Sequence, residues 1–465
     1  MDMMSTLSDD LLLKILSSLP TKDVVSTMLL SKRWKFLWTM VPTLDFQNDF
    51  ESSKDDYAKF RQHVYLFMVL HKSPVLETLK LRLGWHSTTD DITTWIKIAV
   101  ARRVRKLKIH CYSDDDDIFL PSCLYTYNNL EVLKLGNSIV LDVPEDVRLP
   151  SLKTLHLLCV EFRNEESARR LLSGCPLLEE FVLDKSENVS PPCFYLEVPS
   201  LQRLSILDTY REGNDSDVKV VIKTPSLRYL NVVDKCDSGL LFLSENMPDM
   251  VVANVSVVYK NPEMLMRSFT SVKRLSLCLT TSVVSKTIKE LVYYYCDLNS
   301  YYICSCAHYF LVGFSVQIQH RVEFNLLVHL ELCSSVEKWC ELLNWMLESS
   351  PKLKVLKLNK CKPHRFVYAK HIEYPWGKPS SVPECLLFHL NTFEWNFYNG
   401  CREEKKMVAY ILRHAKRLKS AKISLWDLDC EDEPHIFTEW RSFHRASKLC
   451  QLLSEREPRS NWYES

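Results

Sequence analysis

Glycine is scarce in this chain of 465 residues, which contains only eight copies. So few glycines argue against a loop-rich fold held by disulfides and against glycine-rich phosphate-binding loops. No apolar run approaches the roughly 18 residues of a membrane span, so we expect no membrane association. The N-terminus also lacks the basic stretch, apolar core and small-residue cleavage site of a secretory signal. These features predict a protein of the cytosol or the nucleus, and no basic cluster separates the two compartments.

Net charge is almost absent as well, because 59 Lys and Arg against 58 Asp and Glu leave a formal charge of +1. The chain therefore has no general attraction to nucleic acid, and a role of that kind would need a local basic patch. One short basic cluster consists of Arg102, Arg103, Arg105 and Lys106. No aromatic residues are interleaved with it, so we predict no nucleic-acid partner. We expect these cations to pair with the four aspartates at positions 114–117, on a solvated loop between repeats.

Catalytic signatures are missing too, since the sequence holds no G-x-S-x-G elbow, Walker loop, H-E-x-x-H or kinase motif. Cys304, Cys306 and His308 form a C-x-C-x-H pattern, but a structural zinc site usually needs four ligands in two well-spaced pairs. The only obvious fourth ligand is Cys296. Without signs of secretion, many of the 17 cysteines are best interpreted as small buried hydrophobes. We therefore predict a non-catalytic protein with no metal or other cofactor.

What the sequence does contain is one repeated pattern: an apolar residue, two variable residues, an apolar residue, one variable residue and an apolar residue. Ten copies begin at positions 76, 104, 130, 152, 178, 201, 227, 272, 327 and 353, and a degenerate copy begins at 250. Spacing in the first half is about 22–28 residues, the period of leucine-rich repeats. The alternation in each copy predicts a short strand, and a stack of copies buries the apolar face that one copy cannot.

The repeats predict a curved solenoid over residues 60–362, with a continuous parallel sheet on its concave side. Prolines before several strands end one segment and start the next, and residues 165–172 and 337–347 supply return helices. The concave sheet and its loops are the expected surface for an unknown target protein. One interval is too long, because the copies at 272 and 327 lie 55 residues apart. We predict an insertion at about 285–324, which could be a real loop, a degenerate repeat or translated intron sequence.

The first fifty residues hold more apolar surface than so short a segment can bury within itself. Ser8 is a good N-cap, with Asp9 and Asp10 in the first turn of a predicted helix. Pro20 ends that helix, and Thr21 is expected to cap a second one. Both helices are amphipathic, and a packed helical pair is the plain alternative to a surface that docks on another protein.

The string LLLKILSSLPTKDVVSTMLLSKRWKFLW, within residues 7–46, closely resembles the F-box of plant F-box proteins. One departure is Ser8, where that family usually has Pro. The resemblance implies that residues 1–50 bind a Skp-type adaptor, which links the chain to a cullin and a RING protein in an SCF ubiquitin ligase. We place the adaptor contacts on nine apolar residues: Leu7, Leu11, Ile15, Leu16, Leu19, Pro20, Val24, Trp34 and Leu37.

Three C-terminal strings resemble the FBD domain that follows the repeats in many plant F-box proteins: VPECLLFHLNTFEW, EEKKMVAYILRHAKRLKSAKIS and RASKLCQLL. Their strand, helix, strand order matches the repeat, so residues 378–455 are predicted to form an αβ cap on the last sheet edge. The resemblance thus implies an α/β fold with a helical F-box, a leucine-rich-repeat solenoid and an FBD cap. It implies a substrate-recognition subunit of an SCF ligase. The alternative is a binding scaffold, or a non-functional relative, that delivers no substrate.

Overall fold

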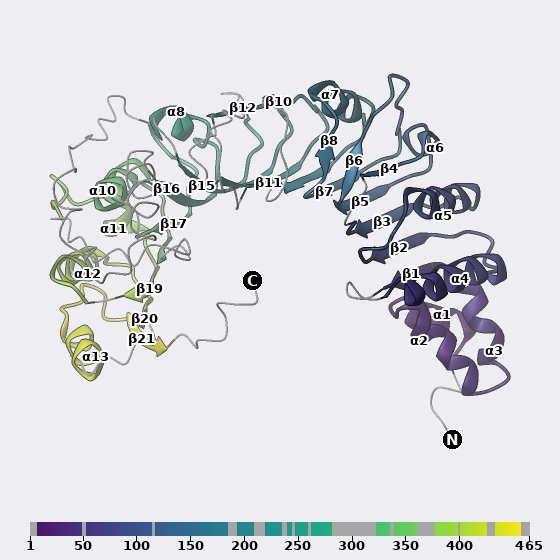
Figure 1. Cartoon of the computed structure of the whole chain (residues 1–465). Coiled ribbons are helices and arrows are strands. Elements are labelled where there is room, and N and C mark those ends of the chain that lie inside the picture. The colour runs from purple at the N-terminus through teal and green to yellow at the C-terminus, as the bar shows by residue number, and fades with distance from the viewer. Residues whose placement is uncertain are drawn as a thin grey trace, which may run out of the picture. The chain divides into compact units, whose positions relative to one another are not determined.

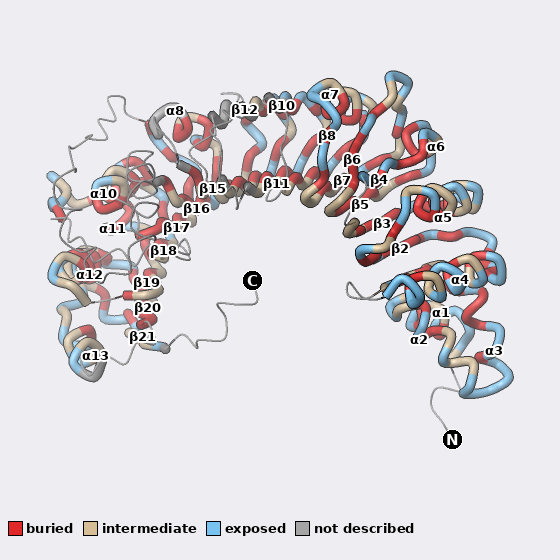
Figure 2. The backbone as a smooth tube through the Cα atoms, viewed as in Figure 1, coloured by how far each residue is buried: buried red, intermediate tan, exposed pale blue. Residues whose placement is uncertain are grey.

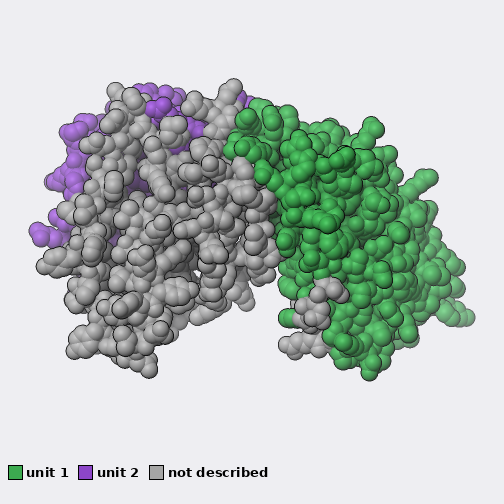
Figure 3. Space-filling model, turned by 45° about the horizontal axis from the view of Figure 1, so that its top comes forward, with its two compact units in different colours: residues 1–227, 240–244 green, residues 228–239, 245–465 purple. Residues whose placement is uncertain are grey.

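The structure is a computed structural model that describes residues 7–48, 53–113, 117–184, 193–208, 219–234, 240–243, 247–258, 262–280, 322–334, 339–359, 376–398, 400–425 and 433–456. The chain divides into two compact units (Figure 3). Unit 1 comprises residues 1–227 and 240–244, and unit 2 comprises residues 228–239 and 245–465. Each unit is built on a ladder of parallel strands with helices along one side (Figure 1).

Unit 1 begins with a group of short helices: α1 (Asp9–Leu16), α2 (Thr21–Ser26), η2 (Thr27–Leu29), α3 (Trp34–Leu37) and η3 (Trp38–Met40). Ser8 caps α1 as predicted, since its hydroxyl accepts a hydrogen bond from the Leu11 amide at 3.4 Å. The predicted cap of α2 is wrong, because Pro20 occupies the N-cap position and makes no side-chain cap bond. The hydroxyl of Thr21 is buried and accepts a hydrogen bond from the Asp45 amide at 2.7 Å instead, which joins the helices to the first strand.

Seven parallel strands form the ladder of unit 1: β1 (Thr43–Gln47), β2 (Thr78–Leu83), β3 (Lys106–Cys111), β5 (Val132–Asn137), β7 (Thr154–Leu158), β9 (Glu180–Asp184) and β11 (Arg203–Asp208). Each predicted copy starts two residues before its strand, and its last two apolar residues point into the core. In β2 these are Leu79 and Leu81, both almost fully buried. The sequence pattern did not predict β1, although Val41, Leu44 and Phe46 follow the same spacing.

In the part of unit 1 that the structure describes, the return segments contain four helices and two small parallel sheets. The helices are α4 (Lys54–Leu70), α5 (Thr89–Ala101), α6 (Ser122–Tyr125) and α7 (Glu165–Ser173). One small sheet joins β4 (Ile118–Phe119), β6 (Ile139–Leu141) and β8 (Glu161–Phe162), and the other joins β10 (Cys193–Leu196), β12 (Lys219–Ile222) and β14 (Leu240–Leu243). The predicted return helix at 165–172 is confirmed as α7.

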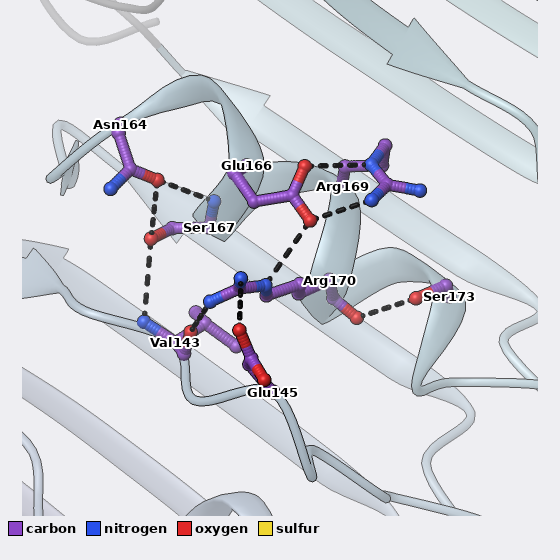
Figure 4. Close-up of polar contacts among 8 residues, drawn as sticks. All are labelled: Val143, Glu145, Asn164, Glu166, Ser167, Arg169, Arg170 and Ser173. Atoms are coloured by element: carbon purple, nitrogen blue, oxygen red, sulfur yellow. Dashed lines mark hydrogen bonds and ion pairs between the residues drawn. The ribbon is translucent and has the colours of Figure 1, made fainter.

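Polar contacts fix α7 against the preceding loop (Figure 4). Asn164 caps the helix by accepting a hydrogen bond from the Ser167 amide at 2.8 Å. The Ser167 hydroxyl in turn accepts a hydrogen bond from the Val143 amide at 3.4 Å. Arg170 donates hydrogen bonds to Glu145 at 3.0 Å and to Glu166 at 3.1 Å. The helix is therefore connected to the repeat that precedes it as well as to the strands beneath it.

Unit 2 shows the same pattern, and its described residues form eight ladder strands: β13 (Tyr229–Asp234), β15 (Val252–Val258), β16 (Arg274–Thr280), β17 (His329–Cys333), β18 (Val355–Asn359), β19 (Thr392–Tyr398), β20 (Ser420–Leu425) and β21 (Gln451–Arg456). The described helices are α8 (Pro262–Arg267), α10 (Trp339–Ser349), α11 (Glu384–Phe388), α12 (Arg402–His414) and α13 (Glu433–Ser442). The degenerate copy at 250 is confirmed, since it forms β15. The copies with the irregular interval form β16 and β17.

The irregular interval leaves the ladder uninterrupted, because β16 pairs directly with β17. Residues 281–321, with Cys296, Cys304, Cys306 and His308, lie outside the described residues. At the end of the predicted insertion, Val322 and Phe324 are buried. The Phe324 amide also donates a hydrogen bond to the carbonyl of Ser349, at the end of α10. Among the strands that the structure describes, β16 and β17 are direct neighbours in the ladder.

The C-terminal region extends the ladder by three strands. The predicted strand, helix, strand order appears as β19, α12 and β20, and α13 then precedes β21. The last strand, β21, carries Glu455, which forms an ion pair with Lys422 of β20 at 2.6 Å. The strand also carries exposed Leu453, so its polar character is incomplete. Its charged groups discourage further edge pairing, and the role of a cap stays a prediction.

The cores of both units are apolar and run beneath the strands (Figure 2). The prediction that cysteines serve as buried hydrophobes is confirmed at Cys111, Cys175, Cys340 and Cys385. Burial raises the pKa of each of these four thiols to about 12. They are therefore protonated near neutral pH and are packing groups, since the thiolate is the reactive form.

Candidate functional site

Helix α1 carries two neighbouring apolar rows that face in different directions. Leu12 and Leu16 are buried, at 0% and 1% exposure, in a core shared with α2, α3 and η3. Leu11 and Ile15 lie one position earlier on the helix, are four residues apart and are 51% and 43% exposed. Leu19, four residues further on, is 37% exposed. One row therefore stabilises the helical group, and the other presents apolar surface to solvent.

The nine predicted adaptor contacts divide according to these two environments. Leu11, Ile15 and Leu19 are exposed, and Leu7 and Pro20 are half-buried. The other four lie in the core of the helical group, where they have little surface for a partner: Leu16, Val24, Trp34 and Leu37. Because they are buried, these four residues mainly stabilise the packing of the helices. The surface that contacts the adaptor stays a prediction.

Sequence reasoning missed four further exposed apolar residues in the same group: Leu29, Leu30, Phe36 and Met40. Leu29 is 90% exposed, and Leu30 and Phe36 are each 66% exposed. Of the 19 large hydrophobic residues exposed within the described ranges, seven lie between positions 11 and 40. The sequence feature that could have identified these residues is the number of apolar residues in this segment, which exceeds what three short helices can bury.

The helical group is fixed to the ladder of unit 1 through α4. The Phe67 ring of α4 packs edge-on against Trp38, with 5.6 Å between centroids, and stacks on Phe46 of β1 at 6.2 Å. The Thr39 carbonyl accepts hydrogen bonds from the amides of Lys72 and Ser73 at 2.7 and 3.0 Å. These contacts connect the segment to the strands by a packed junction.

A buried histidine completes this junction. His71 follows α4, and its Nε2 lies 2.6 Å from the carbonyl oxygen of Val41, so the neutral ring donates this hydrogen bond. Burial lowers the pKa of His71 below its ordinary value, the hydrogen bond to Val41 raises it and nearby Arg102 lowers it further. The guanidinium of Arg102 donates to the carbonyls of Met68 and His71, at 3.1 and 2.8 Å.

Two members of the basic cluster, Arg102 and Arg105, have partners on other elements, and their expected pairing with the aspartates at 114–117 stays a prediction. Arg102 bonds to backbone carbonyls at the end of α4, and Arg105 forms an ion pair with Glu131 on the neighbouring repeat. Residues 114–116 lie outside the described residues. The arginines follow α5 at the strand entrance, beside the carbonyls at the end of α4 and the neighbouring repeat.

The second candidate surface is the exposed face of the ladder. In each strand the residue between the two inward apolar residues points to this face, and we call this register position the central row. In unit 1 the central row holds, in ladder order, Asp45, Lys80, Lys108, Lys134, His156, Val182 and Ser205. Three consecutive strands therefore place a lysine directly opposite another lysine.

The central row of unit 2 has a different charge order. It begins with Asn231, Asn254 and Ser276, and then alternates through Glu331, Lys357, Glu394 and Lys422. Lys357 pairs with Glu394 at 2.6 Å, and Asn359 donates a hydrogen bond to Glu331. Charges on this part of the ladder are therefore compensated by their neighbours, whereas those of unit 1 are largely of one sign.

Within the described ranges, no group of three or more His, Cys, Asp or Glu side chains is placed to hold a metal ion. No described helix combines the length and the apolar character needed to cross a bilayer. What the described residues display is two surfaces suited to binding: an apolar row on a helical group, and a polar ladder face.

A ladder of short parallel strands with a helical group before it defines an α/β leucine-rich-repeat protein. Comparison with protein families agrees for each part. The F-box domain matches residues 4–45, the leucine-rich repeats of FBD-associated F-box protein At5g56370 match residues 92–240, and the FBD domain matches residues 378–423.

Curated relatives match along nearly the whole chain. The putative FBD-associated F-box protein At3g50710 of Arabidopsis thaliana is 49% identical over 97% of this chain and 100% of its own length. The F-box/FBD/LRR-repeat proteins At4g26340 and At5g56420 of the same plant are 39% and 38% identical, each over 97% of this chain and over 100% and 98% of their own lengths. The chain belongs to the F-box/FBD/LRR-repeat protein family.

Membership implies a general role for the N-terminal module. An F-box domain implies binding to a Skp-type adaptor and, in general terms, a substrate-adaptor role in an SCF ubiquitin ligase. F-box adaptors are typically non-catalytic. The exposed apolar row of α1 lies within the matched F-box domain, so family and geometry direct attention to the same residues.

Proposed function

We propose that this protein is the substrate-recognition subunit of an SCF-type cullin–RING ubiquitin ligase. The helical group at residues 7–41 docks on a Skp-type adaptor, which connects it to a cullin and a RING protein. The ladder face holds the target protein. The subunit performs no chemistry itself and acts by bringing its target close to the transfer machinery.

The observation that carries this proposal is the exposed row of Leu11, Ile15 and Leu19 beside the buried row of α1. Complete burial of a large apolar side chain contributes about 1.5–3 kcal/mol, so this row supplies a substantial part of a specific interface. Leu29, Leu30 and Phe36 extend the same apolar character into the following helices. We assign the adaptor contact to these exposed residues, with Leu7 and Pro20 at its margin.

The packed junction at α4 gives the proposal a mechanical basis. Phe67 and His71 hold the helical group against β1 and its neighbours by ring packing and a buried hydrogen bond. A target bound on the ladder of unit 1 would then keep a fixed position relative to the adaptor. Proximity raises the rate of transfer only when the two partners are held in a productive geometry.

The test is co-purification with a Skp-type adaptor. We expect the wild-type chain to form a stable complex, and the triple variant Leu11→Asp, Ile15→Asp, Leu19→Asp to lose it. A matched control replaces three comparably exposed apolar residues elsewhere in unit 1, Trp85, Phe119 and Leu177, by Asp. The control should bind like the wild type. Equal binding by all three proteins, or no binding by the wild type under conditions where other F-box proteins bind, would refute the proposal.

The competing proposal is a scaffold that binds the adaptor without recruiting cullin, or a non-functional relative with a broken solenoid. The direct pairing of β16 with β17 favours the receptor, because it keeps that part of the ladder unbroken across the long interval. Adding cullin and the RING protein to the purified complex distinguishes the two. A receptor gives a four-component assembly, whereas a scaffold stays with the adaptor alone.

A further inference from the structure

The ladder face of unit 1 carries a compact group of basic side chains on β2, β3 and β5. Register places Lys80 opposite Lys108 and Lys108 opposite Lys134. The other members lie two residues to either side along the same strands, on the same face. Together they form the basic face, which consists of Lys80, Arg82, Lys106, Lys108, His110 and Lys134.

Few carboxylates compensate this group. Lys80 pairs with Asp45 of β1 at 3.0 Å. Arg82, Lys106, Lys108 and Lys134 make no ion pair with any residue that the structure describes. On the far side of the ladder, Glu180 of β9 accepts a hydrogen bond from His156 at 2.7 Å. The basic face is therefore bounded at both ends by an acidic side chain that already has a partner.

Like charges directly opposite each other destabilise a sheet, so such an arrangement has a cost within the isolated chain. The two ladders allow a comparison of the same register position. In unit 2 the central row alternates in sign and forms the ion pair between Lys357 and Glu394. In unit 1 the row keeps one sign over three strands. The leucine-rich-repeat architecture does not require a row of like charges, since the ladder of unit 2 has charges of alternating sign at the same position.

The surroundings of Lys108 show how concentrated the charge is. Partial burial lowers the pKa of Lys108, and the ammonium groups of Lys134, Lys80 and Lys106 lower it further. His110 behaves similarly, because burial lowers its pKa first and Arg82, Lys134 and Lys108 add to the effect. An anion placed over these residues would relieve the repulsion and would itself be attracted.

We propose that the basic face docks an acidic segment, rich in Asp and Glu, of the target protein. This inference rests on the proposed function, which assigns the target to the ladder face, and it adds the chemical class of the recognised segment. Carboxylates of the segment would accept charge-assisted hydrogen bonds from Lys108 and Lys134, with Arg82 and Lys106 on either side. Its attraction is electrostatic and therefore sensitive to ionic strength.

The size of the face favours a short peptide segment over a nucleic acid. Adjacent strands lie about 4.8 Å apart, so the row from Lys80 to Lys134 extends over roughly 10 Å. An extended peptide covers that distance with about three residues, at roughly 3.3 Å each. A longer polyanion crossing the strands would meet Asp45 at one end and Glu180 at the other, and both would repel it.

The experiment measures binding of a fluorescein-labelled five-residue peptide of alternating Glu and Ser to the full chain in complex with a Skp-type adaptor. We expect binding that weakens with salt and that falls at least tenfold in the double variant Lys108→Gln, Lys134→Gln. The matched control, Lys357→Gln with Lys422→Gln, removes two compensated lysines from the same row of unit 2. It should remain within twofold of the wild type.

Three outcomes would overturn the proposal: equal binding of the peptide in which Gln replaces Glu, unchanged affinity of the Lys108 and Lys134 variant, or tighter binding of an oligonucleotide with the same number of charges. A folding defect is distinguished by the charge reversal Lys108→Glu, Lys134→Glu, which should bind the corresponding Lys and Ser peptide. Adaptor pull-down distinguishes a failure of this inference from a failure of the proposed function. The Lys108 and Lys134 variants should retain the adaptor, and failure of the wild type and every variant to bind the adaptor would count against the proposed function alone.

Discussion

Arg274 of β16 lies opposite His329 of β17 in a parallel register, although the two residues are 55 positions apart in the chain. Elsewhere in the described ladder, neighbouring strands are linked by much shorter intervals, such as that from Tyr229 to Val252. The ladder thus continues across the long interval without a vacant strand position. Continuity at this point explains how a repeat protein accommodates so large a departure from its period.

This continuity predicts that most of the interval is dispensable for stability. Deleting residues 291–320 reduces the spacing of β16 and β17 to that of the regular repeats and leaves their buried residues in place. We expect the midpoint of thermal unfolding to stay within a few degrees of the wild type. A control deletion of equal length, residues 298–327, removes the fully buried Phe324 and Leu327 and should unfold the protein. Comparable stability of the two deletions would contradict the assignment of Phe324 to the repeat.

The repeat pattern predicted the ladder well because each strand buries the same two apolar positions. All eleven copies that the pattern identified form strands, including the degenerate copy at β15. Strand β1 was missed because its pattern, Val41, Leu44 and Phe46, lies in a segment whose resemblance was to a different module. A helical module and the first repeat share these residues, so a division of the chain into separate domains could not represent both.

The candidate site was less predictable for a physical reason. Helix α1 has apolar residues at adjacent positions, and periodicity alone does not decide which row faces the core. That choice depends on Trp34, Leu37 and Trp38, which are distant in sequence and close against Leu12 and Leu16. The basic face was likewise invisible along the chain, because its lysines lie about 26 residues apart and meet only through strand register.

The two rows of α1 should separate stability from binding. Leu12→Ala removes a fully buried side chain and should lower the free energy of unfolding by about 2–5 kcal/mol. Leu11→Ala truncates an exposed side chain and should change it by less than about 1 kcal/mol, while weakening the adaptor complex. Urea unfolding and adaptor titration on the same samples provide both values. A stable Leu12→Ala variant would show that this row does not support the helical group.

The N-terminus of α7 offers a test of how return helices are held. Asn164→Ala removes the acceptor for the Ser167 amide and should lower the free energy of unfolding by about 1 kcal/mol. Asn164→Asp keeps an acceptor at the cap and should stay within a few tenths of a kcal/mol of the wild type. Equal loss in both variants, measured by urea unfolding, would mean that the amide group acts through some other contact.

The junction at His71 predicts a pH dependence. Burial lowers the pKa of His71, so the folded state keeps the ring neutral while the unfolded chain takes up a proton near the ordinary value of 6.5. Its contribution to stability is therefore present above about pH 6.5 and is lost as the pH falls toward the folded-state pKa. Protonation would also place an N–H on Nδ1, which is buried and has no partner.

Urea unfolding at pH 7.5 and 5.5 tests this dependence. Burial also lowers the pKa of His110, His156, His329 and His414, so the wild-type protein should lose stability on acidification through several groups. His71→Gln keeps a donor for the Val41 carbonyl and removes the titration, so its loss between the two pH values should be smaller. An equal loss in the two proteins would show that His71 does not contribute to the pH dependence.

Gly136 of β5 lies beneath the imidazole of His110 on the basic face, and this contact explains why the strand has glycine there. A Cβ atom at position 136 would lie 2.4 Å from His110 Nδ1, closer than any real contact allows. Gly136→Ala should therefore displace the ring and destabilise the protein, despite the gain of about 0.4–1 kcal/mol that alanine brings by restricting the unfolded chain.

In a His110→Ala background the clash is absent, so Gly136→Ala should be neutral or stabilising. Gly377→Ala, where nothing lies within 4 Å, is the matched control and should show only the small effect. Identical effects of Gly136→Ala in both backgrounds, measured by urea unfolding as a double-mutant cycle, would rule out the contact with His110 as the cause.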